Sequence, residues 1–282
     1  MVIWVFNNRI MKLSEIKNIL ETKGIYLTKL RGQNFLLDEN ILNSIVKTAN
    51  ISKEDTIVEI GTGFGFLTAY LLETGAKVIS FEIDKKVYEI AGDLLKNFHN
   101  LKLIHQDFMR SDITQLCDGV FRVVANIPYN IASQILIKLW YNKEKVSDIY
   151  LLVQKEFGQR IVSKTAGKEI GFLSILLQSD YEIEIIKKVS PHCFYPAPKV
   201  ESVYLKFTPQ ESSIDASKRE KYFQFLKSSF SERRKKLLPK IKKMYANALE
   251  IIQKCGIKEN VRAEELKVHE WITIFNNLEE SL

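Results

Sequence analysis

The chain has 282 residues, of which 46% are hydrophobic and 27% are charged, and its formal net charge at pH 7 is +7. This length fits one large domain and a smaller second one, and the hydrophobic content can bury a full core, which excludes a disordered chain. No apolar run approaches the roughly 20 residues of a membrane-spanning helix, and the apolar opening is too short for a secretory signal peptide. We therefore expect a cytoplasmic protein that does not enter a membrane.

The three cysteines, Cys117, Cys193 and Cys255, lie far apart and show neither disulfide pairing nor metal-ligand spacing. His192 beside Cys193 is the one adjacent pair of soft ligands, and two ligands do not make a zinc site. We therefore expect no metal, and we assign the cysteines to packing or to the surface of a protein in a reducing compartment.

The positive charge is concentrated late in the chain. Between Lys218 and Lys243 there are eleven Lys or Arg residues and two Glu, whereas the remainder has slightly more acidic than basic residues. Some of these side chains are expected simply to cover a solvated helix face. A local excess of this size nevertheless indicates a polyanionic partner that meets a defined surface.

From about residue 40 to 180, β-branched apolar runs alternate with segments of helical periodicity. This alternation predicts an α/β fold with a doubly wound, largely parallel sheet. Two later extended runs, Glu182–Val189 and Val200–Phe207, are expected to close the sheet as an antiparallel edge pair. The predicted strands are Thr56–Ile60, Lys77–Glu82, Leu101–Gln106, Phe121–Asn126 and Ile149–Gln154, and the predicted helices between them include Phe66–Glu73, Lys86–Asn97 and Ala132–Trp140.

The last third of the chain has helical periodicity only. It follows the polar stretch Thr208–Ser217, which is typical of a linker, and Pro239 should begin or kink a helix within it. We therefore divide the chain into an N-terminal extension or helix at 1–30, a sheet domain at 31–208 and a small all-helical domain at 209–282. The apolar stripes of this last domain contain Phe223, Leu226, Phe230, Leu237, Ile241, Leu249, Ile252, Trp271, Phe275 and Leu278.

A glycine-rich turn with Gly61, Gly63 and Gly65 follows the first predicted strand. Glycines at this point let the backbone turn sharply and approach a ligand closely. Glu82 ends the second strand, where a carboxylate can accept hydrogen bonds from both hydroxyls of a ribose. The Gly-x-Gly-x-Gly spacing differs from the dinucleotide fingerprint, and no phosphate-binding lysine follows. A nucleoside without a pyrophosphate therefore fits better, and S-adenosylmethionine is the obvious candidate.

Asp107 closes the third predicted strand. Its carboxylate can accept a hydrogen bond from an adenine amine, and the backbone N–H of Phe108 can reach a ring nitrogen, but an aspartate here equally suits a helix N-cap. The residues alone leave both roles open. Strands one to four nevertheless each end in a polar or glycine feature at the carboxyl edge, where open α/β sheets bind ligands.

The tetrapeptide Asn126-Ile127-Pro128-Tyr129 ends the fourth strand and suits the presentation of a base amine to an alkylating agent. The lone pair of such an amine is delocalised into the ring. An amide oxygen and a neighbouring backbone carbonyl that accept its two N–H bonds draw the nitrogen towards tetrahedral geometry. Pro128 biases the preceding residue towards an extended conformation, and Tyr129 offers a ring for stacking. On its own the tetrapeptide is also an ordinary exit from a strand.

Together these motifs resemble those of the ribosomal RNA adenine dimethyltransferase family, over almost the whole chain and in the family's order. The resemblance implies a class I methyltransferase fold, S-adenosylmethionine as methyl donor, and dimethylation of two adjacent adenosines near the 3′ end of small-subunit ribosomal RNA. The motifs are Gly32–Leu36, the glycine turn, Glu82–Asp84, Gln106-Asp107, Asn126–Ile131, Gln154–Glu156, Phe194–Val200 and Arg262–Leu266.

The resemblance implies which residues hold the cofactor. Glu82 would bind the ribose, Asp107 the adenine amine, and Asn126 would serve both the cofactor and the target amine. The glycine turn would pass beneath the cofactor, and the first motif would line its methionine end. The implied cofactor-binding residues are Asn34, Leu36, Gly61, Gly63, Glu82, Asp107 and Asn126.

The resemblance also implies which residues act on the RNA. Asn126 would clamp the target amine, and Tyr129 and Phe194 would hold the flipped adenine between two rings, although a Phe in a proline-rich loop is also a common packing anchor. Neither a metal nor a covalent intermediate is implied, because a sulfonium is already an activated donor. The residues implied to bind RNA phosphates are Arg233, Arg234, Lys235 and Lys236.

Two other functions stay open at this point. The large-subunit adenine methyltransferases of macrolide resistance share most of these motifs, although the long basic helical tail favours the small-subunit enzyme. A protein that acts chiefly as a ribosome assembly factor is the other alternative, and the intact glycine turn, Glu82 and Asn126 argue against it. We expect small-subunit ribosomal RNA, or the assembling small subunit, as the partner of a monomer.

Overall fold

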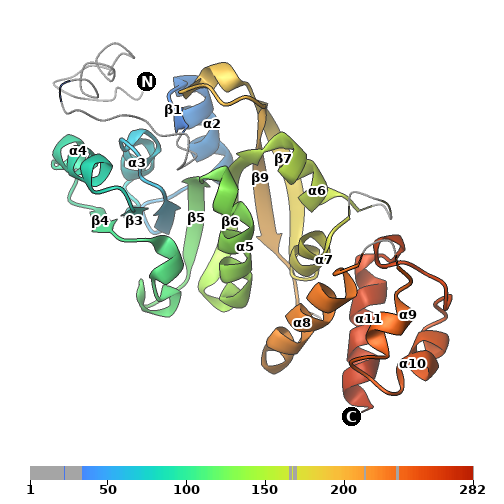
Figure 1. Cartoon of the computed structure of the whole chain (residues 1–282). Helices are drawn as coiled ribbons and strands as arrows, with labels where there is room; N and C mark the ends of the chain where they lie inside the picture. Colours follow the sequence, from blue (N-terminus) through green and yellow to red (C-terminus); the bar gives the residue numbers. More distant parts are fainter. Residues whose placement is uncertain are drawn as a thin grey trace. The chain divides into compact units, whose positions relative to one another are not determined.

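A computed structural model describes Thr22 and residues 34–164, 167, 170–212, 214–232 and 235–281. Apart from Thr22, the predicted N-terminal extension lies outside the described residues, as do Arg233 and Arg234. The chain forms two compact units, the first of Met1–Lys155 and Ile185–Phe207 and the second of Glu156–Glu184 and Thr208–Leu282 (Figure 1). Residues 156–184, which the sequence places in the sheet domain, thus belong to the second unit.

The strands and helices have the following bounds. The strands are β1 (Phe35–Leu36), β2 (Thr56–Ile60), β3 (Lys77–Glu82), β4 (Leu101–His105), β5 (Phe121–Asn126), β6 (Val146–Gln154), β7 (Tyr181–Val189), β8 (Phe194–Tyr195) and β9 (Ser202–Pro209). The α-helices are α2 (Glu39–Ala49), α3 (Phe66–Leu72), α4 (Lys85–Leu95), α5 (Ala132–Tyr141), α6 (Lys155–Val162), α7 (Phe172–Gln178), α8 (Arg219–Ser229), α9 (Leu238–Ile241), α10 (Ala248–Lys254) and α11 (Val268–Glu280). The short 3-10 turns are η2 (Phe108–Arg110), η3 (Ile113–Gln115), η4 (Tyr129–Ile131), η5 (Lys143–Lys145), η6 (Pro191–Cys193), η7 (Ala216–Lys218) and η8 (Ala263–Glu265).

The main sheet has seven strands in the order β4-β3-β2-β5-β6-β9-β7. The pairs from β4 to β6 are parallel, and β9 runs antiparallel to β6. The predicted doubly wound sheet is therefore confirmed, and three predicted strands (β2, β3 and β5) match residue for residue. The strand order reverses between β2 and β5, which is where open α/β sheets leave a crevice at the carboxyl ends of their strands.

One face of the sheet is covered by α2, α3 and α4, because each of these helices buries an apolar side towards the same cluster. Leu42, Tyr70 and Ile90 come from the three helices, and Val124 and Leu152 come from β5 and β6. α2 begins at Asp38, whose Oδ1 accepts a hydrogen bond from the N–H of Ile41 at 3.0 Å. This N-cap satisfies an N–H group that the first turn of a helix leaves without a partner. In the part of the chain that the structure describes, no helix is both long and apolar enough to cross a bilayer.

The second unit has an aromatic core. The Phe225 ring contacts those of Trp271 and Phe275, with centroids 5.6 Å apart in each case, and the hydroxyls of Tyr222 and Ser179 lie 2.7 Å apart. Pro239 lies in the first turn of α9, as predicted for a proline that begins a helix. The predicted apolar stripes are confirmed except at two positions that are only half-buried, Phe223 and Leu249.

Of the basic residues between Lys218 and Lys243 that the structure describes, Arg219 and Lys240 are buried, so they do not add to a charged surface. Arg219 forms an ion pair with Asp180 at 3.4 Å. The Nζ atom of Lys240 donates to the backbone carbonyls of Ser229, the last residue of α8, at 2.8 Å and of Glu232 at 2.6 Å. Carbonyls in the last turn of a helix have no N–H partner further along the helix, and the lysine supplies a donor at Ser229. The sequence did not reveal this structural use of a basic side chain.

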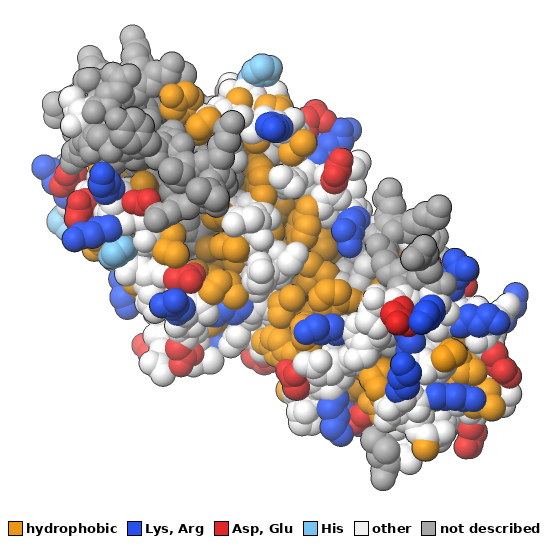
Figure 2. All heavy atoms as spheres, viewed as in Figure 1, with side chains coloured by type: hydrophobic (Ala, Val, Ile, Leu, Met, Phe, Trp, Pro, Cys, Tyr) orange, Lys and Arg blue, Asp and Glu red, His pale blue; other side chains and the backbone are white. Residues whose placement is uncertain are grey.

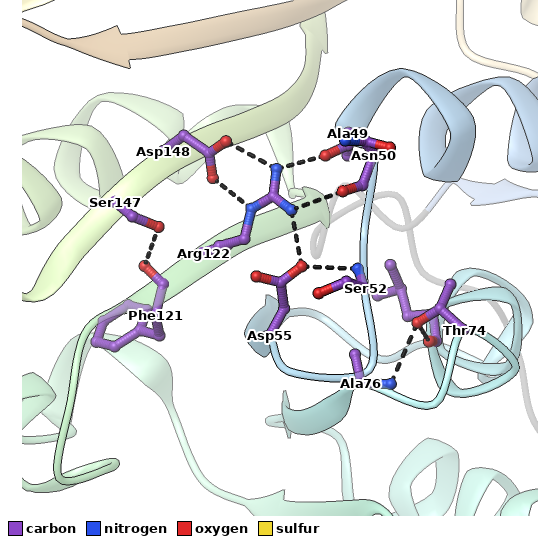
Figure 3. A network of polar contacts seen from close by, with 11 residues as sticks. Ala49, Asn50, Ser52, Asp55, Thr74, Ala76, Phe121, Arg122, Ser147 and Asp148 are labelled. Atoms are coloured by element: carbon purple, nitrogen blue, oxygen red, sulfur yellow. Dashed lines mark hydrogen bonds and ion pairs between the residues drawn. The ribbon is translucent and has the colours of Figure 1, made fainter.

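Arg122 on β5 ties four segments together near the amino end of the sheet (Figure 3). Its Nε and Nη2 atoms donate to the two carboxylate oxygens of Asp148 on β6, each at 2.8 Å. Nη1 donates to Asp55, just before β2, at 3.0 Å and to the backbone carbonyl of Asn50 at 3.3 Å, and Nη2 also donates to the carbonyl of Ala49. The hydrogen bonds to Asp148 and Asp55 raise the pKa of Arg122. One guanidinium thus joins two strands to the end of α2.

We expect Arg122→Met to lower the free energy of unfolding by about 3 kcal/mol, because it leaves two half-buried carboxylates without their cation. Urea unfolding followed by circular dichroism measures this change. Lys102→Met, at an exposed position on β4, is the control and should change stability by less than about 0.5 kcal/mol. Equal effects of the two substitutions would show that the Arg122 network does not support the sheet.

Candidate active site

A pocket of about 380 Å³ lies at the carboxyl edge of the sheet, where the strand order reverses. Its walls come from the residues that follow β2, β3, β4 and β5, together with β1. The structure thus brings together most of the predicted site residues, although they are spread over almost 100 positions of the sequence. The predicted residues that line the pocket are Asn34, Leu36, Gly61, Gly63, Glu82, Asp107, Asn126 and Tyr129.

The glycine turn requires glycine at Gly63 for two reasons. Its φ angle is 57°, and a Cβ atom added there would lie 2.8 Å from the ring of Phe35. The turn is fixed to β3 because the N–H groups of Gly61 and Thr62 both donate to the carbonyl of Phe81, at 2.9 and 3.0 Å. The backbone therefore reaches the pocket without a side chain in the way, as the sequence predicts.

Glu82 is held in one orientation by two backbone donors. Its Oε2 atom accepts from the N–H of Gly63 and its Oε1 atom from the N–H of Asp84, both at 2.9 Å. Burial raises the pKa of this carboxyl, which is only 5% exposed. Each carboxylate oxygen keeps a further lone pair that can accept a hydrogen bond. The group can therefore receive two hydroxyls from a ligand in the pocket, as a ribose would provide.

Glu59 also lines the pocket, and the sequence reasoning assigned it no role. It lies within β2 and is 1% exposed, and its Oε2 atom accepts from the hydroxyls of Thr68 and Ser80, both at 2.6 Å. Burial raises the pKa of Glu59 to about 8. An acidic residue at a buried strand position directly before a glycine turn was the signal that could have identified it. Such a carboxyl becomes easier to ionise when a cationic ligand enters the pocket.

The raised pKa makes the stability of the fold depend on pH. Between the ordinary value of 4.5 and about 8, folded Glu59 holds a proton that the unfolded chain has released. The contribution of Glu59 to the free energy of unfolding is therefore complete below pH 4.5. It is lost as the pH rises through about 8, and the free energy of unfolding falls by up to about 1.4 kcal/mol per pH unit.

Glu59→Gln cannot ionise and should lack this contribution. Urea unfolding at pH 5, 6, 7 and 8 measures the difference in unfolding free energy between wild type and variant. We expect wild type to lose stability relative to the variant as pH increases. A difference that stays constant over this range would contradict the raised pKa.

Of the two roles that the sequence left open for Asp107, the structure shows the helix N-cap. Its Oδ1 atom accepts from the N–H of Met109 at 2.9 Å, so it is the N-cap of η2. The residue also lines the pocket, next to Phe108 and Met109. The N-cap is therefore confirmed, while the contact to an adenine amine stays a prediction.

Asn126 and Tyr129 are each anchored by a contact to another segment. The Nδ2 atom of Asn126 donates to the backbone carbonyl of Asn34 at 2.9 Å, which fixes the amide plane. Among the described residues, none donates a hydrogen bond to its Oδ1 atom, which is left as an acceptor at the pocket. The hydroxyls of Tyr129 and Ser202 lie 2.6 Å apart, and burial raises the pKa of Tyr129, so the phenol stays neutral. The site thus offers a fixed amide oxygen beside a fixed, uncharged aromatic ring.

Phe194 packs in the apolar core. It lies in β8, opposite Leu36 of β1, is 4% exposed and belongs to the apolar cluster beneath α2 and α3. Phe194 is not among the described residues that line the pocket. Stacking of the Phe194 ring on the target adenine stays a prediction, whereas its packing in the apolar cluster is observed. The β1–β8 pair holds Asn34 and Leu36 at the edge of the pocket, a link that two-residue strands do not reveal in sequence.

The strand order, the glycine turn after β2 and the acidic residue that ends β3 define a class I methyltransferase fold. A profile of the family described as ribosomal RNA adenine dimethylase matches residues 27–280. The chain belongs to this family.

Individual relatives agree with this assignment. The chain is 37% identical over 267 residues to the ribosomal RNA small subunit methyltransferase A of Clostridium botulinum, covering 93% of this chain and 96% of that protein. It is 36% identical over 249 residues to the protein of the same name from Persephonella marina, covering 87% of this chain and 91% of that protein.

Two solved structures share the fold. A dimethyladenosine transferase from Plasmodium falciparum matches with a TM-score of 0.75 and 24% identity, covering 86% of this chain and 96% of that one. The 23S rRNA methyltransferase ErmE matches with a TM-score of 0.69 and 22% identity, covering 87% of this chain and 100% of that one.

Proposed function

We propose that this chain dimethylates the 6-amino groups of two adjacent adenosines near the 3′ end of small-subunit ribosomal RNA, with S-adenosylmethionine as the methyl donor. The observation that carries the proposal is the Oδ1 atom of Asn126, which accepts no hydrogen bond from any described residue and which the amide nitrogen fixes at the pocket beside Tyr129. The curated relatives named above, which match over most of the chain, are small-subunit enzymes. The RNA substrate implies a cytoplasmic enzyme, and we propose that it acts as a monomer.

The residues of the pocket fit S-adenosylmethionine. Glu82 presents two oriented acceptors for the ribose hydroxyls, and Asp107 presents a carboxylate for the adenine amine. Glu59 adds a buried acidic group, which suits a ligand that carries positive charge. S-adenosylmethionine, when bound, supplies a methyl group that the positive sulfur activates for transfer.

Asn126 acts on the amine that receives the methyl group. Its Oδ1 atom accepts one amine N–H, and the backbone carbonyl of Ile127 accepts the other. The two acceptors stabilise the pyramidal nitrogen of the transition state more than the flat nitrogen of the ground state. Tyr129 stays neutral because its pKa is raised, so it stacks on the base and removes no proton. A strong general base is unnecessary, because the nitrogen loses its proton readily once it carries the new methyl group.

We expect Asn126→Ala to lower methyl transfer by at least about 100-fold, because it removes a fixed acceptor that acts in the transition state. The assay is radiolabelled methyl transfer to small subunits that lack the modification, followed by nucleoside analysis for dimethyladenosine. Binding of S-adenosylhomocysteine, measured by calorimetry, should remain detectable in the variant. Asn43→Ala on α2, where the amide donates to the backbone carbonyl of Glu39 in the same helix, is the control.

The same assay separates the proposal from its alternatives. Full activity of Asn126→Ala would show that the side chain of Asn126 does not bind the target amine in the transition state. Methylation of free large-subunit RNA in preference to small subunits would favour the large-subunit enzyme, which the fold shared with ErmE keeps as a candidate. A wild-type protein that binds neither S-adenosylmethionine nor its demethylated product would favour the assembly factor.

We also propose that the late basic segment binds RNA phosphates, with Arg233 and Arg234 outside the described residues. Lys235 and Lys236 are exposed, and Lys235 lies 3.2 Å from Glu232. Figure 2 shows Lys and Arg side chains spread over the visible face of the second unit, with acidic ones between them. Recognition of the RNA would then rest on its shape and on the exposed adenines rather than on a base-by-base code.

Lys235→Gln together with Lys236→Gln should reduce the salt dependence of RNA binding. The slope in question is that of the logarithm of the binding constant against the logarithm of the salt concentration. The loss of two phosphate contacts reduces its magnitude by about 1.8 if duplex RNA behaves as B-DNA does, or by about 1.4 for a single strand. Filter binding at a series of salt concentrations measures the slope. Lys47→Gln with Lys102→Gln, two exposed lysines of the first unit, removes the same charge as a control. Equal slopes for the two double variants would contradict a specific basic surface.

A further inference from the structure

Lys138 on α5 directs its ammonium into a turn of the backbone. The Nζ atom donates to the carbonyls of Phe108 at 2.8 Å, Met109 at 3.0 Å and Ser111 at 2.6 Å. It also lies 5.1 Å from the centre of the Phe108 ring. An ammonium has three N–H donors, so these carbonyls use all of them. The side chain is half-buried, and burial lowers the pKa of Lys138.

These contacts hold η2 from Phe108, its first residue, to its C-cap Ser111. Asp107 holds the start of the turn through the N–H of Met109. The carbonyl of Phe108 also accepts from the N–H and the hydroxyl of Ser111, at 3.1 and 2.7 Å, whereas carbonyls at the end of such a turn have no N–H partner within it, and the cation of Lys138 supplies a donor to that of Ser111. Both ends of a three-residue turn, which has little stability of its own, are therefore tied by side chains.

Lys138 does not line the pocket, but the turn that it holds does. Asp107, Phe108 and Met109 are all part of the pocket wall. The carboxylate of Asp107 and the N–H of Phe108 are the groups predicted from the sequence to form hydrogen bonds with the adenine of the cofactor. α5 also follows directly on η4, which carries Tyr129. One helix thus connects the side of the pocket that receives the target base with the side that receives the cofactor base.

We infer that Lys138 is a positioning residue that sets the Asp107–Met109 turn for the recognition of adenine, and that it thereby determines the preference of the pocket for a 6-aminopurine over a 6-oxopurine. This inference rests on the proposed function, because it takes a purine nucleoside as the ligand. A 6-oxopurine reverses both hydrogen bonds. Its carbonyl faces the Asp107 carboxylate, and its protonated ring nitrogen faces the N–H of Phe108, so two acceptors and two donors oppose each other. The preference holds only as long as the turn keeps both groups in place.

Calorimetry with S-adenosylhomocysteine and its 6-oxo counterpart S-inosylhomocysteine tests the inference without any turnover. Wild type should prefer the amino compound by roughly 10- to 100-fold, the range of one hydrogen bond to a charged group. Lys138→Met keeps most of the side-chain volume and removes the ammonium. We expect its preference to fall below about threefold, chiefly through weaker binding of the amino compound.

Two further variants separate positioning from stability. Lys138→Arg keeps the positive charge, but its planar fork cannot converge on three carbonyls, so an intermediate preference is expected. Lys102→Met should keep the wild-type preference. If Lys138→Met fails to fold, as judged by circular dichroism, Lys138→Arg carries the comparison, and a wild-type preference in it overturns the inference.

The outcomes also distinguish this inference from the function on which it rests. If Lys138→Met weakens both compounds by the same factor, the preference is unchanged and Lys138 is only structural. If wild type binds both compounds equally, the turn does not read the base and the inference fails, while methyl transfer remains possible. If wild type binds neither compound, the proposed cofactor itself is wrong.

Discussion

The pairing of β2 with β3 on one side and β5 on the other is the constraint on which the site depends. Because these pairs are parallel, the residues that follow each strand leave the sheet at the same edge. The glycine turn, Glu82 and Asn126 meet there although they are distant in sequence. Arg122 joins the opposite ends of β2, β5 and β6 to the end of α2. The amino edge of the sheet thus carries this ion-pair network, and the carboxyl edge carries the pocket.

The side chains at the pocket share one mode of construction. Each functional group is oriented by hydrogen bonds to the protein and keeps a further acceptor or a ring at the pocket. Asn126 uses its nitrogen towards Asn34, and Tyr129 uses its hydroxyl towards Ser202, which leaves an oxygen and a ring for the substrate. Glu82 is aligned by two N–H groups. Orientation is therefore fixed during folding, so that little ordering is required when the ligands bind.

The sequence predicted the features that depend on local pattern. Alternating apolar runs identified the strands, and the polar residues at their ends identified the edge at which they meet. Features that depend on contacts between distant segments were not accessible. The use of Lys138 follows from α5 lying beside η2, and the packing of Phe194 follows from the β1–β8 pair. Glu59 was visible in sequence as an acidic residue in an apolar strand, but its hydroxyl partners Thr68 and Ser80 come from two other elements.

The placement of Lys240 affects how substitutions in the basic segment are interpreted. Its ammonium closes the end of α8 from within the second unit instead of facing the solvent. A scan that neutralises every lysine from 235 to 243 would therefore mix two kinds of loss, since one variant would loosen the scaffold and others would weaken contact with the nucleic acid. Thermal melting of each variant, measured before any titration, would assign the two kinds of loss correctly.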